Sequence, residues 1–163
     1  FHTPDFPLTY AIIKATKEQN AEEVRAFLKK QVRAEWPMTL TRIKYTPIGL
    51  DEIIHNYKTK DQYEKKVDFI TPDELIKNTS KPESYRALLD TTDSVPEIDN
   101  VFRWLNGTDT YAWKINEKPE KLEERVARFY ANSVRALLNC DRNHDDAVAS
   151  FGVRRAKNLG DVK

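Results

Sequence analysis

Helix-start signals recur along this chain, whereas glycine, the residue that most tight turns require, occurs only 4 times in 163 residues. The start signal is a Ser, Thr or Asn followed three residues later by Glu or Gln. In this capping box the side chain of each residue accepts a hydrogen bond from the backbone amide of the other. It occurs at Asn20–Glu23, Thr59–Gln62, Thr71–Glu74, Ser80–Glu83 and Ser94–Glu97. The last three also hold a proline, which loses no hydrogen bond in a first helical turn. These signals favour helices over hairpins.

Apolar residues recur at helical spacing between the signals. The stripes run from Leu8 to Ala15, Val24 to Val32, Leu50 to Tyr57, Tyr63 to Ile70, Ile98 to Leu105 and Leu122 to Leu138. Residues 39–45 form the one extended stretch, and a lone strand has nothing to pair with. We therefore expect an all-α fold of stacked antiparallel helical hairpins over residues 1–140. A polar C-terminal extension, residues 141–163, should stay mobile unless a partner binds it.

Composition narrows the classes of partner and compartment. With 27 basic and 26 acidic side chains the net charge is +1, so no global field attracts nucleic acid or an anionic membrane. Cys140 is the only cysteine, which excludes an intrachain disulfide and favours a reducing compartment. No apolar run is long enough to cross a bilayer, so we expect no membrane insertion. The chain starts at Phe1, which either a cleaved organellar targeting segment or a removed expression tag would explain.

Residue types that bind metals or catalyse reactions are scattered along the chain. The histidines, His2, His55 and His144, are far apart, and Cys140 with His144 would supply only two ligands. The acidic run 141–145 lacks the glycine and glutamate that a calcium loop needs at its sixth and twelfth positions. The glycines are too dispersed for a phosphate-binding loop. We therefore expect no cofactor, no metal, no small-molecule ligand and no enzymatic activity.

Aromatic residues are crowded around the turn at residues 106–107. Phe102, Trp104, Tyr111 and Trp113 lie within twelve residues of one another. They either pack a core around a tight helix–helix connection or form an anchor surface, since Trp and Tyr dominate protein interfaces. Helical geometry turns Phe102 toward the core and leaves Trp104 on another face. Trp104, Tyr111 and Trp113 are therefore the candidate partner-binding residues.

The first helical pair resembles a pentatricopeptide repeat. The resemblance is carried by residues 9–15, TYAIIKA, and residues 21–28, AEEVRAFL, and covers about a quarter of the chain. It implies helical hairpins stacked into a solenoid, in a family that is common in organelles and reads single-stranded RNA one base per repeat. One recognisable repeat can bind only a short stretch of RNA, and a net charge near zero attracts phosphates weakly. RNA is therefore the alternative partner, after a large protein complex.

Size, the start at Phe1 and the degenerate helical repeats together resemble the extra small subunits of the mitochondrial ATP synthase of trypanosomes and their relatives. This resemblance implies a non-catalytic accessory subunit docked on the alpha subunits of the catalytic head. Its place would be mitochondrial, on the matrix side and peripheral to the inner membrane. The alternatives are an organellar RNA-binding repeat protein, and a small helical enzyme or regulatory domain cut from a longer chain.

Overall fold

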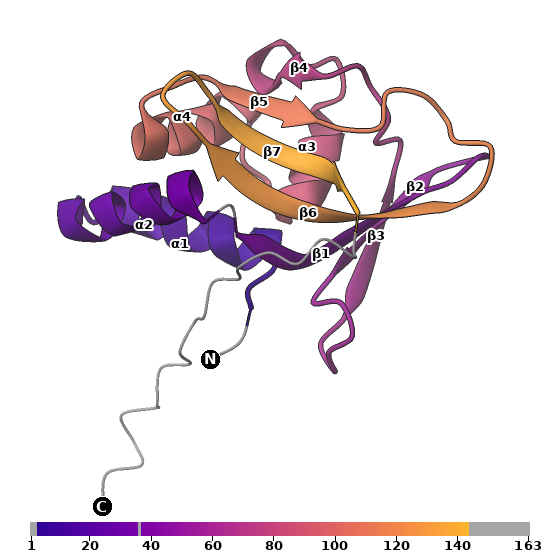
Figure 1. Ribbon diagram of the computed structural model, residues 1–163, viewed down its shortest axis with the longest axis horizontal. Helices are drawn as coiled ribbons and strands as arrows, with labels where there is room; N and C mark the ends of the chain where they lie inside the picture. The colour runs from indigo at the N-terminus through magenta and orange to yellow at the C-terminus, as the bar shows by residue number, and fades with distance from the viewer. Residues whose placement is uncertain (1–2, 36, 144–163) are drawn as a thin grey trace, which may run out of the picture.

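A curled seven-stranded sheet with helices on one face forms the protein over residues 3–35 and 37–143, the residues that this computed structural model describes (Figure 1). The helices are α1 (Phe6–Glu18), α2 (Glu22–Ala34), α3 (Pro82–Leu89) and α4 (Val95–Asn106), with a 3-10 turn η1 (Ile76–Asn78). The strands are β1 (Met38–Tyr45), β2 (Asp51–His55), β3 (Tyr63–Val67), β4 (Glu74–Leu75), β5 (Thr110–Trp113), β6 (Glu123–Ala131) and β7 (Ala136–Arg142). The fold is mixed α/β, and the all-α prediction is wrong.

The strand order is β3-β2-β1-β6-β7-β5-β4. All neighbours are antiparallel except β5 and β7, which run parallel. Pairing shifts register between Met38 and Arg42 on one side of β6, and between Val126 and Arg128 on the other. Such irregularities bend a strand and increase its local twist. They help to explain why the sheet curls around the helices instead of lying flat.

The hydrophobic core lies between the inner face of the sheet and the helices. The Phe129 ring on β6 meets Phe6 of α1 at a centroid distance of 4.2 Å and Phe102 of α4 at 5.7 Å. The start of α1 is tied to β1, because the Phe6 amide donates to Thr41 Oγ1 at 2.9 Å. The first helical pair is therefore part of a sheet-based core and not an independent repeat.

Several helices form where the local signals predict them. Helices α1 and α2 contain the first two apolar stripes, and α4 contains the stripe from Ile98 to Leu105. Ser94 and Glu97 form a complete capping box at the start of α4, and Gly107 ends that helix at φ +81°. Helix α3 begins at Pro82, but its N-cap is Lys81 and not the predicted Ser80. The signals at Thr59 and Thr71 precede no α-helix, and the N-cap of α2 is Ala21 and not Asn20.

The other stripes are strands. The segment from Leu50 to Tyr57 contains β2, the segment from Tyr63 to Ile70 contains β3, and the segment from Leu122 to Leu138 contains β6 and the start of β7. In the middle of β6 four consecutive residues, 126–129, are buried, because a central strand is covered on both faces. That burial removes the alternation by which a strand is recognised. The expected extended stretch at 39–45 is β1, and its partners are the segments misread as helices.

Tight turns form here largely without glycine. Asn56 and Lys58 adopt positive φ values of 52° and 58° in the β2–β3 turn. In the β6–β7 turn the Asn132 side chain accepts hydrogen bonds from the amides of Val134 and Arg135, at 2.8 and 2.9 Å. Asparagine tolerates the left-handed region and caps turns with its own side chain. A low glycine content therefore does not exclude hairpins.

The fold also corrects the inferences that depended on helical repeats. A helical hairpin solenoid is excluded by the sheet, so the pentatricopeptide-like architecture is wrong. The mitochondrial ATP synthase interpretation rested partly on that architecture and loses this support, while the predicted partner and compartment stay untested predictions. Strand β7 ends at Arg142, past the expected boundary at residue 140, and residues 144–163 of the predicted extension lie outside the described residues. No helix in the described part of the chain has the length and apolarity needed to cross a membrane.

Candidate functional site

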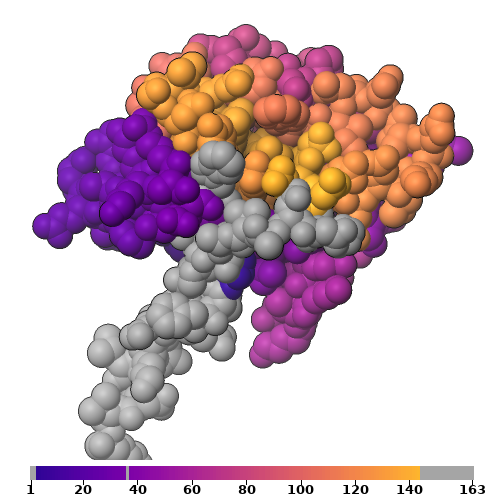
Figure 2. Space-filling model, viewed as in Figure 1, coloured from indigo at the N-terminus to yellow at the C-terminus, as the bar shows by residue number. Residues whose placement is uncertain are grey.

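The outer face of the sheet, opposite the helices, carries rows of aromatic and polar side chains. One row crosses four strands, because Trp113 on β5 pairs with Asn139 on β7, Asn139 pairs with Arg128 on β6, and Arg128 pairs with Met38 on β1. A second row joins Tyr111, Leu137 and Tyr130. Side chains of β6 and β7, orange to yellow, come to the surface in Figure 2.

A groove of about 220 Å³ opens where these rows meet, and we call it the Trp113 groove. Its lining residues are Trp113, Arg128, Tyr130, Asn132, Arg135, Leu137 and Asn139. Two of them carry a guanidinium group and none carries a carboxylate. The Trp113 side chain is 43% exposed, so the indole ring is available at the surface. The groove therefore places an exposed ring beside the exposed side chain of Arg135, whereas Arg128 is only 8% exposed.

Local contacts hold the polar groups of the groove in place. The Arg135 guanidinium lies over the Tyr111 ring, 5.1 Å from its centroid. Asn132 Oδ1 accepts hydrogen bonds from the backbone amides of Val134 and Arg135 in the turn before β7. Its Nδ2 donates to the Tyr130 hydroxyl at 3.1 Å. Asn139 Oδ1 accepts the Asp141 amide at 3.1 Å, which leaves its NH₂ group as a donor on the groove side. The groove is therefore built on strands and a bonded turn.

Positive charge continues along the outer face toward β1. Val126 pairs with Arg42 on one side and with Arg142 on the other, so these arginines lie one row from the groove. The acidic residues Glu52 and Glu124 pair with Lys44, further along β1. Both signs of charge are present on this part of the face, because Glu124 lies in one groove with Arg42.

The structure brings together two of the three predicted partner-binding residues. Tyr111 and Trp113 lie two residues apart on β5 and share the outer face, since side chains alternate along a strand. Trp104 lies on α4, half-buried beneath the Arg25 guanidinium at 4.9 Å from its ring centroid, and Arg25 Nε donates to its carbonyl at 2.8 Å. Phe102 is in the core, as predicted.

Sequence reasoning missed the groove residues of β6 and β7. Arg128, Arg135 and Asn139 lie in a segment read as one long helix, so no common face with Trp113 was expected. Residues 126–129 are all buried, so the alternation that marks a strand is missing there and no local signal pointed to this face.

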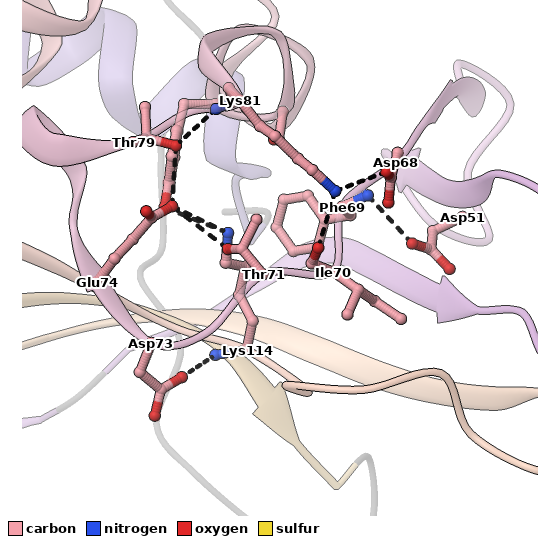
Figure 3. Close-up of polar contacts among 12 residues, drawn as sticks. Asp51, Asp68, Phe69, Ile70, Thr71, Asp73, Glu74, Thr79, Lys81 and Lys114 are labelled. Carbon is pink, nitrogen blue, oxygen red and sulfur yellow. Dashed lines mark hydrogen bonds and ion pairs between the residues drawn. The ribbon is translucent and has the colours of Figure 1, made fainter.

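A second polar cluster lies inside the protein, around Lys114 at the end of β5 (Figure 3). The Lys114 side chain is fully buried, and its Nζ lies 3.6 Å from Glu74 Oε1. It also lies 4.8 to 5.0 Å from the ring centroids of Tyr85 and Phe69. Burial lowers the pKa of Lys114, and the Glu74 carboxylate partly opposes that shift. A lysine with a lowered pKa is a candidate nucleophile or general base.

The partners of Lys114 assign the cluster a structural role. Glu74 Oε1 accepts hydrogen bonds from the hydroxyls of Thr71, Thr79 and Tyr85, at 3.3, 2.9 and 2.8 Å. The Lys114 amide donates to Asp73 Oδ1 at 3.0 Å. These polar groups satisfy one another and join β5 to the β4–η1 segment and to α3. The bond between the Thr71 hydroxyl and Glu74 joins two side chains and is not the predicted capping box, and no α-helix follows it.

Of the histidine and cysteine residues considered for metal binding, the structure describes His55 and Cys140. His55 is buried, with its ring nitrogens 3.2 Å from Thr41 Oγ1 and 3.0 Å from the Ala87 carbonyl. Cys140 is buried in the core, and burial raises the pKa of its thiol to about 12. Over residues 3–35 and 37–143 no three His, Cys, Asp or Glu side chains gather as metal ligands. His2 and His144 lie outside these ranges, as does the end of the run 141–145.

Comparison with known proteins leaves the geometry as the basis for a functional proposal. No protein-family model, no curated protein and no solved structure matches this chain.

Proposed function

We propose that this chain is a non-catalytic binding module and that the Trp113 groove holds a base of a single-stranded nucleic acid. The observation that carries the proposal is an exposed indole in one groove with the exposed Arg135 guanidinium. Aromatic rings on an open sheet face serve as stacking platforms for unpaired bases. Arginine contributes phosphate contacts and stacking at such sites.

The dimensions of the groove favour a planar ring over a larger ligand. Pockets that enclose a drug-sized molecule usually measure roughly 300 to 1,000 Å³. The Trp113 groove, at about 220 Å³, is smaller than these pockets. A single base stacked on Trp113 would leave the rest of a strand free to run along the sheet.

The near-neutral net charge limits the expected salt dependence of such binding. Two arginines line the groove, so we expect few phosphate contacts and a modest salt dependence. For single strands the logarithm of the affinity falls with the logarithm of the salt concentration by about 0.7 per phosphate contact. Arg128 is only 8% exposed, so one contact at Arg135 gives a slope near −0.7, which is far from that of a strongly basic protein.

Fluorescence anisotropy with labelled single-stranded RNA and DNA at two salt concentrations tests the proposal. Stacking contributes about 1–3 kcal/mol per base, so Trp113→Ala should weaken binding by about 5- to 150-fold. Trp104→Ala is the matched control, because it removes the same ring from the helical side of the molecule. Absence of binding at low salt, or equal affinities of wild type and Trp113→Ala, would refute the proposal.

Attachment to a larger protein assembly is a second candidate function, and a separate surface favours it. Ile48, Leu50 and Leu122 are exposed aliphatic side chains on the β1–β2 loop and the start of β6. The β1–β2 and β5–β6 loops meet at one end of the molecule, where Lys118 Nζ donates to the Gly49 carbonyl at 2.9 Å (Figure 1). Size-exclusion chromatography of native extracts tests this candidate. A protein that elutes only as a free 19.0 kDa chain would exclude it, whereas elution with an assembly that Ile48→Asp abolishes would support it.

A further inference from the structure

A second groove lies on the same outer face, on the other side of β6 from the Trp113 groove. It measures about 350 Å³ and is lined by Leu40, Arg42, Tyr57, Lys58 and Glu124. We call it the Tyr57 groove. The Tyr57 ring has the Arg42 guanidinium 4.9 Å from its centroid and Lys58 Nζ 5.3 Å from it. This groove therefore repeats the pairing of an aromatic ring with cations.

Backbone contacts fix the ring and the cations of the Tyr57 groove. The Tyr57 amide donates to the Leu40 carbonyl of β1 at 2.9 Å, which holds the turn after β2 against the sheet. Arg42 Nη1 donates to the carbonyls of Thr39 and Thr41, at 2.8 and 3.3 Å. These acceptors are neutral, so they orient the guanidinium and leave its charge in place. Glu124 contributes one carboxylate to the lining against the two cations of Arg42 and Lys58.

The distance between the grooves suits a short strand of nucleic acid. Three strand-to-strand steps separate β5 from β1 in the sheet order. At about 4.8 Å per step they span roughly 14 Å, which is about four nucleotides at the ~3.4 Å spacing of stacked bases. Arg128 lies on the path, because it pairs with Asn139 on one side and with Met38 on the other. Arg128 is only 8% exposed, so the cations available to a ligand lie at the two ends of the route, at Arg135 and at Arg42 and Lys58.

We infer that the Trp113 and Tyr57 grooves are two contact points for one single strand, which crosses β5, β7, β6 and β1 with Tyr57 as its second stacking ring. The inference rests on the proposed function and adds to it a bound length and a path. It also predicts that Trp113 contributes to the binding of short and long oligonucleotides, whereas Tyr57 contributes only to the binding of long ones.

A length series on the full chain tests the inference. The probes are fluorescein-labelled oligouridylates and the matching oligodeoxythymidylates, each as dinucleotide, tetranucleotide and octanucleotide. The proteins are wild type, Trp113→Ala, Tyr57→Ala and Tyr57→Phe, each checked by circular dichroism for an unchanged fold. Tyr57→Phe keeps the stacking ring and loses only the hydroxyl, so it is the matched control.

We expect wild-type affinity to rise between dinucleotide and octanucleotide. Tyr57→Ala should weaken octanucleotide binding by about 5- to 150-fold, leave dinucleotide binding unchanged, and differ from Tyr57→Phe, which should match wild type. Trp113→Ala should weaken both. Affinity that does not rise with length, or octanucleotide binding that Tyr57→Ala leaves unchanged, would overturn the inference. If Trp113→Ala still weakened binding in that case, the proposed function would stand without the inference. Equal displacement of the octanucleotide from wild type and Tyr57→Ala by polyglutamate would also overturn it, since charge alone would then explain binding.

Discussion

Lys114 and Glu74 are joined inside the protein, but their surroundings differ, so replacing one or the other should have unequal effects. Glu74→Ala leaves the Lys114 ammonium buried without its carboxylate and removes the acceptor of three hydroxyl groups. Removing one partner of a buried ion pair destabilises a protein by about 3–5 kcal/mol. Lys114→Met instead removes the buried charge and keeps an apolar chain between the rings of Phe69 and Tyr85. Glu74 then keeps its hydroxyl donors.

The expected cost of Lys114→Met is small because two effects oppose each other. The cation–π contacts are worth roughly 0.5–2 kcal/mol, while desolvation of a buried ammonium costs several kcal/mol. Methionine also makes favourable contacts with aromatic rings. We therefore expect Lys114→Met to lower the free energy of unfolding by about 1 kcal/mol or less, against about 3–5 kcal/mol for Glu74→Ala.

Urea unfolding followed by circular dichroism measures both changes. With a slope of about 2 kcal/mol per molar urea, Glu74→Ala should lower the unfolding midpoint by roughly 1.5–2.5 M at an unchanged slope. The double variant should be more stable than Glu74→Ala alone, since it no longer buries an unpaired ammonium. Lys77→Met at the exposed pair with Asp109 is the control and should cost less than about 1 kcal/mol. A Lys114→Met variant as unstable as Glu74→Ala would refute the reasoning.

Three further predictions concern pH and two helix ends. Burial first, and hydrogen bonds to carboxylates second, raise the pKa values of Tyr10, Tyr63 and Tyr85. A folded-state pKa above the unfolded value of about 10 means that stability is full below pH 10 and is lost as pH rises further. The lowered pKa of Lys114 acts on stability in the opposite direction, but this one lysine opposes the three tyrosines. The urea midpoint should therefore fall as the pH rises from 9 to 11. A constant midpoint would contradict this prediction. Ser94→Ala removes the capping box of α4 and should cost about 1 kcal/mol in urea unfolding, whereas Ser80→Ala, at a position that caps no helix, should cost less. Gly107→Ala should cost about 1 kcal/mol through its positive φ alone, since no atom lies within 4 Å of the added methyl group; replacement by Asn, which tolerates this conformation, should cost less in the same assay.

The sequence by itself determined the helices whose signals are local. The apolar stripes of α1, α2 and α4 and the capping box at Ser94 involve residues at most one or two helical turns apart. Their energetics need no distant partner, so periodicity predicted all three; the predicted cap holds for α4, whereas Ala21 and not Asn20 is the N-cap of α2. The density of aromatic residues also pointed to Tyr111 and Trp113, which the structure places on one face of β5.

Only the tertiary structure decided the sheet and the groove. Strand β1 pairs with β6 through Arg42 and Val126, which are more than eighty residues apart, and no local pattern encodes such a pairing. Burial on both faces then removed the alternation in β6 that would have revealed a strand. Arg128 and Asn139 join Trp113 only because β6 and β7 align beside β5 in one register. The candidate site is therefore a property of strand pairing, whose free energy depends on contacts between segments that are distant in the chain.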